Sequence, residues 1–225
     1  MLTAAQSETT GASDALASLC RTYWPPIYAY VRRRGYSAPD AQDLTQEFFA
    51  RLLERKAIAT VRPDKGRFRS FLLASLNHFL SDAWDKAHAQ KRDAAKTIHF
   101  DTAAAESWLR EPAAQTITPD QAFERRWALT LLDQVYQKLQ SEYRHQHKGE
   151  LFETLRSTLA GSSEAAPYAD LAGRLNMSEV AVKVAVHRLR QRYRALLRET
   201  IAATVQSPEE IEEELRYLVK VLSGG

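Results

Sequence analysis

Hydrophobic positions recur at helical spacing through almost the whole chain, and the strict alternation typical of half-buried strands is nearly absent. The clearest stripe runs at four-residue intervals from Phe123 to Leu139. It is preceded by Thr118-Pro119-Asp120-Gln121, which combines a cap residue, a proline at the first helical position and a capping-box glutamine. The pattern predicts an all-α protein.

Breaks in this periodicity predict two helical domains joined by a flexible linker, the C-terminal one containing a helix-turn-helix. The linker is rich in Ala and Thr, with a short helix expected near Trp108. The expected segments are a disordered N-terminus (1–12), a first domain (13–95), the linker (96–117), a second domain (118–200) and a final amphipathic helix (207–223).

The final helix begins at the capped start Ser207-Pro208-Glu209-Glu210 and carries further acids beside an apolar stripe. We expect it to complete the core of the second domain. The alternative is that it covers cationic surface until a partner displaces it.

An acidic stripe marks the helix that Ser37 is expected to cap. At 100° per residue, Asp40, Asp43, Glu47 and Glu54 fall on one narrow line, beside an apolar arc that contains Leu44 and Phe48. Such a line is either a solvated face or a docking site for a basic partner helix, and the stripe alone does not decide between them.

A long helix is expected from about Phe68 to Arg92, with an inward stripe that includes Leu72 and Leu76. Its outer side mixes polar, basic and aromatic groups, a combination that suits single-stranded nucleic acid. The alternative is a solvated helix with Trp84 in the core. The outer residues are Arg67, Arg69, Asn77, His78, Trp84, Lys86, His88, Lys91 and Arg92.

The stretch Pro167–Arg194 predicts two short helices joined by a tight turn, with Ser178 capping the second. Val182, Val186, Leu189 and Tyr193 form its buried stripe, while cations dominate the opposite arc. An apolar back and a basic front are typical of a helix-turn-helix whose second helix enters a DNA major groove. The alternative is an ordinary helical hairpin with a solvated cationic face.

Composition narrows the function classes. The net charge of +3 and the pI near 9.0 only mildly favour an anionic partner. The single cysteine, Cys20, excludes an internal disulfide and a cysteine-based metal cage. We find no Gly-rich phosphate loop, nucleophile motif or HExxH, and no apolar run long enough to cross a bilayer. We therefore expect a cytoplasmic protein that is not an enzyme, with no cofactor, metal or membrane partner.

Three segments, in this order, carry a resemblance to a known family. Asp40–Leu52 is similar to the sigma region 2 helix that grips RNA polymerase. Gly66–Asp82 is similar to the part that melts and reads the −10 element, and Tyr168–Arg190 to region 4, which reads the −35 element. The chain thus resembles a bacterial sigma factor of the extracytoplasmic-function (ECF) class of the sigma-70 superfamily, over Asp14–Arg92 and Thr118–Arg198.

The resemblance implies that core RNA polymerase is the partner, through the β′ clamp helices and the β flap. Asp43 and Glu47 would form charge-assisted pairs, while Leu44 and Phe48 would pack at the centre of the contact. Thr45 lies beside the stripe, and phosphorylation there would add negative charge next to the polymerase. A Ser/Thr kinase or an anti-sigma factor is thus a candidate regulator. The implied core-binding residues are Asp40, Asp43, Leu44, Glu47 and Phe48.

The resemblance also implies promoter DNA as a partner, with the loop Ala57–Arg67 cradling a base flipped from the opened strand. His78 departs from the Asn that relatives often carry. The implied strand-binding residues are Arg62, Lys65, Arg67, Phe68, Asn77, Lys86, Lys91 and Arg92. The implied −35 residues are Glu179, Ala181, Lys183, Val184, His187, Arg188 and Gln191.

Val180, Ala181 and Val184 place few hydrogen-bonding groups on the second helix of the helix-turn-helix, which is expected to read the DNA. Direct base readout is therefore expected to rest on Lys183, His187 and Arg188, with DNA shape supplying the remainder.

Other readings explain less of the chain. A helix-turn-helix regulator that binds duplex DNA without polymerase accounts for the second domain but leaves the acidic stripe without a role. A sigma mimic that sequesters a regulator does not need a basic reading helix. An enzyme lacks a recognisable motif, since His145 and His147 have no matching ligand cluster.

Overall fold

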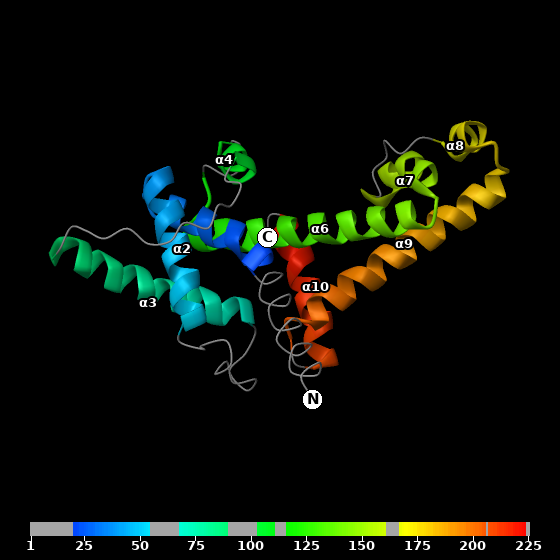
Figure 1. Ribbon diagram of the computed structural model, residues 1–225. Coiled ribbons are helices and arrows are strands. Elements are labelled where there is room, and N and C mark those ends of the chain that lie inside the picture. Colours follow the sequence, from blue (N-terminus) through cyan, green and yellow to red (C-terminus); the bar gives the residue numbers. More distant parts are fainter. Residues whose placement is uncertain are drawn as a thin grey trace, which may run out of the picture. The chain divides into compact units, whose positions relative to one another are not determined.

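The computed structural model describes residues 20–54, 68–89, 103–110, 116–160, 167–205 and 207–223. Every regular element in these ranges is helical, which confirms the all-α prediction for them (Figure 1). None of these helices is both long and apolar enough to span a membrane. The elements are a helix over 20–33, α2 (Ala38–Glu54), α3 (Phe68–Ala89), α4 (Ala103–Leu109), α6 (Pro119–His145), α7 (Gly149–Leu155), the 3₁₀ helix η2 (Arg156–Ala160), α8 (Tyr168–Leu175), α9 (Glu179–Ala202) and α10 (Pro208–Leu222).

Local capping explains where several helices begin. The backbone N–H of Asp40 donates to Ser37 Oγ at 3.2 Å, and that of Glu210 donates to Ser207 Oγ at 3.4 Å. At the start of α6, Thr118 N–H donates to Gln121 Oε1 at 2.9 Å while Gln121 N–H donates to Thr118 Oγ1 at 3.2 Å, forming the predicted capping box. These bonds satisfy donors that the first turn of a helix leaves unpaired.

The chain divides into two compact units, and the division differs from the expected one. Unit 1 combines the described residues up to Thr130 with those from Thr204 onward, and unit 2 comprises Leu131–Ala203. The division between the units thus falls inside α6, whereas the second domain was expected over 118–200. The expectation that α10 completes the second domain is wrong, because α10 belongs to unit 1.

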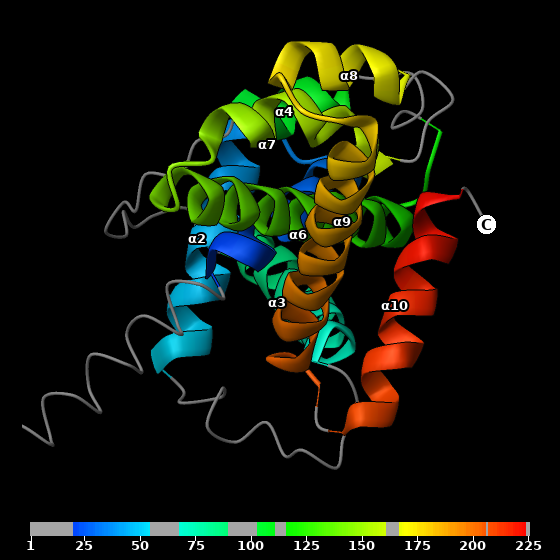
Figure 2. The ribbon, with the colours of Figure 1, turned by 90° about the vertical axis from the view of Figure 1, so that its right-hand side faces the viewer.

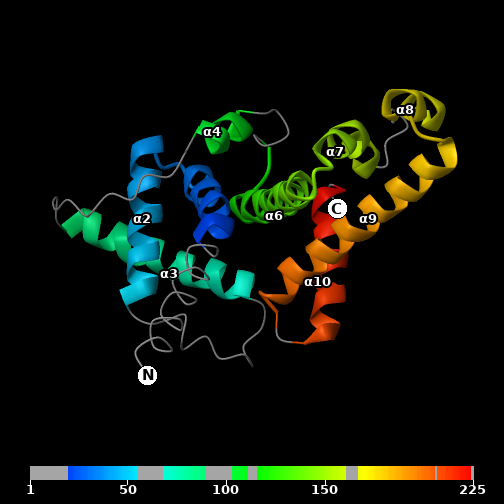
Figure 3. The same ribbon diagram turned by 45° about the vertical axis from the view of Figure 1, so that its right-hand side comes forward.

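In unit 1 the helix over 20–33 supplies much of the core. Tyr23, Trp24 and Tyr28 are almost fully buried, and the rings of Trp24 and Tyr28 stack with centroids 5.0 Å apart. α2 crosses α3 and contacts it (Figures 1 and 3). These aromatic side chains thus form a core in the unit that contains α2 and α3, the two helices of the candidate site.

The expected flexible linker is structured in part. Trp108 of α4 is buried and packs with Ala29 and Ala122, which confirms a short helix near this residue. The Glu106 carboxylate accepts hydrogen bonds from Arg32 Nε at 2.7 Å and from Tyr28 OH at 2.6 Å. Residues 103–110 are therefore anchored to the first helix of unit 1 rather than forming a free connection.

Unit 2 is a helical assembly built on the second half of α6. Phe152 of α7 packs against the rings of Tyr136 and Tyr143 at 5.3 and 5.7 Å. α8 contacts both α7 and the first turns of α9, so the α8–α9 pair lies on this platform (Figure 2). The predicted stripe on α6 is confirmed as buried: Phe123, Trp127, Leu131, Val135 and Leu139. On α9, Val182, Val186 and Leu189 are buried, whereas Tyr193 is half-buried.

Candidate functional site

The acidic stripe of α2 is only partly available to a partner. Asp40 and Asp43 are exposed, and Asp40 Oδ2 accepts a hydrogen bond from Ser37 Oγ at 2.6 Å. Glu47 forms an ion pair with Arg51 one turn later on the same helix, so its charge is balanced within α2. Leu44 is half-buried. Among the stripe's described side chains, Asp40 and Asp43 thus provide the accessible negative charge, and the side chain of Glu54 lies outside the described part.

Phe48 does not belong to the accessible surface, contrary to expectation. It is 3% exposed and packs edge to face with Phe79 of α3, with ring centroids 5.6 Å apart, and with its neighbour Phe49. The apolar arc beside the stripe is therefore occupied by α3 of the same chain. Helical periodicity correctly predicted that Phe48 is buried, whereas its expected place at the polymerase contact came from the family resemblance and does not fit its packing against Phe79.

Thr45 is also inaccessible. Its side chain is fully buried, and its hydroxyl donates to the carbonyl of Ala41 at 2.7 Å. A kinase cannot reach this hydroxyl in the folded unit, so the expected regulation through Thr45 does not fit the structure. A Thr45→Glu variant would bury a carboxylate and would report on folding rather than on regulation.

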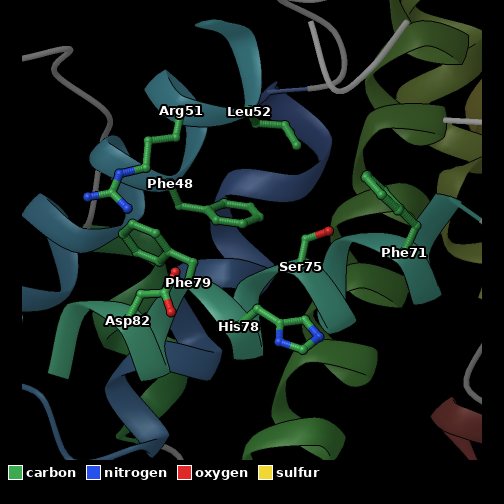
Figure 4. A pocket seen from close by; sticks show the side chains of 8 residues that line it. All are labelled: Phe48, Arg51, Leu52, Phe71, Ser75, His78, Phe79 and Asp82. Atoms are coloured by element: carbon green, nitrogen blue, oxygen red, sulfur yellow. The ribbon is translucent and has the colours of Figure 1, made fainter. Parts of the chain in front are cut away.

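A pocket of about 210 Å³ opens between α2 and α3. Phe48 and Phe79 lie at its centre, and the Arg51 guanidinium lies 5.0 Å from the Phe79 ring centroid (Figure 4). The Phe48 and Phe79 rings are almost fully buried, so half-buried Phe71 and exposed His78 provide the accessible rings of the pocket, and such rings suit a flat π system. The lining residues are Phe48, Arg51, Leu52, Phe71, Ser75, His78, Phe79 and Asp82.

Two expected strand-binding groups, Phe68 and Asn77, lie in different turns of α3. Phe68 is half-buried with its ring edge-on to Tyr23 at 5.2 Å, so only part of it is accessible. Asn77 is exposed, and its Oδ1 accepts a hydrogen bond from Tyr30 OH at 2.5 Å. Lys86 lies on α3, but its side chain is outside the described part. Arg62, Lys65, Arg67, Lys91, Arg92 and the loop Ala57–Arg67 also lie outside the described residues.

Arg69 was expected on the outer face of α3, and this expectation is wrong. Its side chain is 6% exposed and forms ion pairs with Glu124 of α6 and Glu214 of α10. The guanidinium carbon lies 5.1 Å from the Trp127 ring and 4.2 Å from the Tyr217 ring. We call these five residues the Arg69 cluster, and it lies within unit 1.

The α8–α9 pair has the local geometry that the sequence predicted. Ser178 Oγ accepts the N–H of Ala181 at 3.2 Å and caps α9. Asn176 ends α8 in the left-handed conformation with φ 50°, and the N–H of Met177 returns to the carbonyl of Ala172 at 3.0 Å. Three residues thus turn the chain between α8 and α9, which contact each other (Figure 2).

The outer face of α9 carries most of the residues expected to contact DNA. Lys183, His187 and Arg188 are exposed, and Lys183 Nζ lies 5.9 Å from the Tyr168 ring. Ala181 is half-buried because it lies nearer the packed side. The remaining expected residues, Glu179, Val184 and Gln191, are exposed.

Arg192 differs from these cations. Its guanidinium donates to both Glu142 oxygens, at 2.8 and 2.7 Å, and to Glu199 at 3.0 Å. The hydrogen bonds from Arg192 lower the pKa of the Glu142 carboxyl. Arg192 therefore links α9 to α6 within unit 2 and does not contribute to the exposed cationic face of α9. In the described ranges, no three His, Cys, Asp or Glu side chains converge to hold a metal ion.

The comparisons with known proteins agree with the fold of unit 1. Residues 19–90 match the family model of Sigma-70 region 2. The match covers less than half of the chain and lies within unit 1. No curated protein and no solved structure matches the chain. The match ends at residue 90, so any role for α8 and α9 rests on their own geometry.

Proposed function

We propose that the chain is an ECF-class sigma factor that directs core RNA polymerase to promoters through −10 and −35 contacts. The observation that carries this proposal is the order of two features along one chain. The region 2 match covers residues 19–90. It is followed along the chain by α9, a capped helix whose exposed face carries cations. The chain itself does no chemistry in this proposal, because the polymerase supplies catalysis.

The polymerase contact is assigned to the exposed part of the α2 stripe. Asp40 and Asp43 offer negative charge to the β′ clamp helices, and half-buried Leu44 offers apolar surface between them and Glu47. Charge complementarity of this kind steers association and sets the orientation of the partner. Phe48 supports the surface from beneath through Phe79 rather than touching the polymerase.

The opened −10 strand is assigned to the α3 side of unit 1. Asn77 is exposed there, and the pocket between α2 and α3 is lined by the half-buried ring of Phe71 and the exposed imidazole of His78. Stacking of an unpaired base on such rings offsets the cost of taking it out of the duplex. The duplex −35 element is assigned to α9, with α8 and α9 acting as a helix-turn-helix.

A core-binding experiment tests the proposal. Asp43→Arg should weaken binding of the chain to core RNA polymerase about ten-fold or more, because it places a cation against a basic surface. Glu150→Arg makes the same charge change at an exposed acid of unit 2 and should leave core binding nearly unchanged. Equal losses in both variants would point to bulk charge and would remove the assignment of α2.

The second candidate is a regulator that binds duplex DNA without polymerase, and the exposed cationic face of α9 is the observation in its favour. Gel-shift assays with and without core polymerase separate the two functions. Tight sequence-specific binding by the isolated chain would support the regulator, whereas specific binding only in the presence of core supports the sigma factor.

A further inference from the structure

Large apolar side chains that remain exposed are concentrated at one place in the described ranges. Met177, Val180 and Val184 are 37%, 71% and 45% exposed, and all three lie in the turn before α9 or in its first turns. The fourth such residue, Val219, lies on α10. Exposed apolar groups at the start of a cationic helix indicate a binding partner that offers apolar surface at the same place.

The two valines share one face of α9. Val180 and Val184 are four residues apart and therefore neighbours on the helix surface, whereas Val182 and Val186 face the core of unit 2. Exposed Lys183, His187 and Arg188 flank the two valines. The valines are thus the apolar centre of a face with a cationic border.

The cationic border decides which partner fits this face. A border of Lys and Arg favours a polyanion, and a helix of this width enters the major groove of B-DNA. The thymine 5-methyl is the apolar group that base edges present in that groove. Valine also suits such a contact because its side chain has one strongly preferred rotamer in a helix, so its methyl groups are already positioned.

We propose that Val180 and Val184 read the 5-methyl groups of thymines in the DNA element bound by α9. This inference rests on the proposed function and specifies the base chemistry of its −35 contact. Residues four apart rise about 6 Å along a helix, which is close to two base-pair steps of about 3.4 Å. The two valines therefore reach thymines one or two steps apart, and the cations hold the flanking phosphates.

The test uses the complete chain bound to core RNA polymerase. Selection from a random duplex pool first yields the preferred upstream element. Each thymine of that element is then replaced by uracil, which removes the methyl group and leaves every hydrogen-bonding edge in place. We expect one or two replacements to weaken binding about four-fold each, the effect of losing one buried methyl group.

Valine variants link each thymine to one residue. Val184→Ala should abolish the difference between thymine and uracil at one position, and Val180→Ala should do so at its neighbour. Both residues are exposed, so the fold does not depend on them. Val219→Ala removes another exposed valine, on α10, and should retain both differences.

The outcomes separate this inference from the proposed function. A specific element whose uracil versions bind as well as the thymine versions would overturn the methyl readout and leave the sigma function intact. Weaker polymerase assembly by Val184→Ala, with an unchanged thymine preference, would also overturn it by making the face a polymerase contact. Absence of any preferred upstream element would overturn the proposed −35 contact itself.

Discussion

Arg69 of α3 and Glu214 of α10 form a buried ion pair at 3.3 Å although 145 residues separate them in the chain. Their side chains are 6% and 3% exposed. Glu124 approaches the same guanidinium from α6, so one cation serves two carboxylates. This arrangement joins three segments of unit 1 that are distant in sequence.

The pKa shifts in the Arg69 cluster reflect the presence of two carboxylates beside one cation. Burial alone would lower the pKa of Arg69, but the charges of Glu124 and Glu214 outweigh it and raise the pKa. Burial raises the pKa of Glu124, and Arg69 offsets only part of that rise. The arginine is therefore the group on which the cluster depends most.

Replacing Arg69 should destabilise unit 1 strongly. Arg69→Met leaves two buried carboxylates without their cation, and we expect a loss of about 3–5 kcal/mol in the free energy of unfolding. Urea denaturation followed by circular dichroism measures the loss. Arg21→Met, at an exposed arginine of unit 1, is the matched control and should cost less than about 0.5 kcal/mol.

A triple variant tests whether charge is the cause. Adding Glu124→Leu and Glu214→Leu to Arg69→Met removes the uncompensated carboxylates, and apolar replacement of a buried ionic cluster is often neutral or stabilising. We therefore expect most of the lost stability to return. If Arg69→Met is as stable as the Arg21→Met control, the cluster contributes nothing through charge.

Stability should depend on pH through Glu106. Hydrogen bonding from Arg32, the largest cause, lowers the pKa of this carboxyl below its ordinary value of 4.5. A lowered folded-state pKa means that the ionised carboxylate stabilises the fold above pH 4.5 and that this stabilisation is lost as the pH falls through the folded value. Glu106→Gln should thus cost about 1–2 kcal/mol at pH 7, and progressively less as the pH falls below 4.5.

A double-mutant cycle identifies the source of that pH dependence. In an Arg32→Gln background, Glu106→Gln should cause little further loss of stability, both at pH 7 and below pH 4.5. The reason is that the charge-assisted pair is already broken. An undiminished effect of Glu106→Gln in that background would assign the stabilisation to a group other than Arg32.

The turn between α8 and α9 should be sensitive to the residue at position 176. Asn176 adopts φ 50°, which side chains other than Asn and Gly seldom tolerate. Asn176→Ala should lower the stability of unit 2 by about 1 kcal/mol, whereas Asn176→Gly should retain or slightly increase it. Thermal unfolding of both variants measures the difference, and equal stability would show that the turn imposes no strain at this position.

Local features of this fold could be predicted from the sequence because they depend on neighbours within four residues. Caps such as Ser178 and the capping box of Thr118 and Gln121 form bonds across three residues, and the structure confirms them. The buried stripe from Phe123 to Leu139 is confirmed for the same reason.

Long-range features could not be predicted in this way. Periodicity shows that Phe48 is buried but not that Phe79 of the same chain covers it. An arginine is ordinarily exposed, and nothing near Arg69 in the sequence points to Glu214. The boundary at Thr130 lies inside α6, where an unbroken helical pattern gives no sign that the units divide.

The discontinuous sequence of unit 1 has a consequence for synthesis on the ribosome. α3 and the first half of α6 are translated before unit 2, but Glu214 and Tyr217 follow only after unit 2 is complete. Arg69 therefore lacks half of its partners while Leu131–Ala203 is already free to fold. We therefore expect unit 1 to close only after α10 has been translated, so that the usual N-terminal-first order of domain folding does not apply to it.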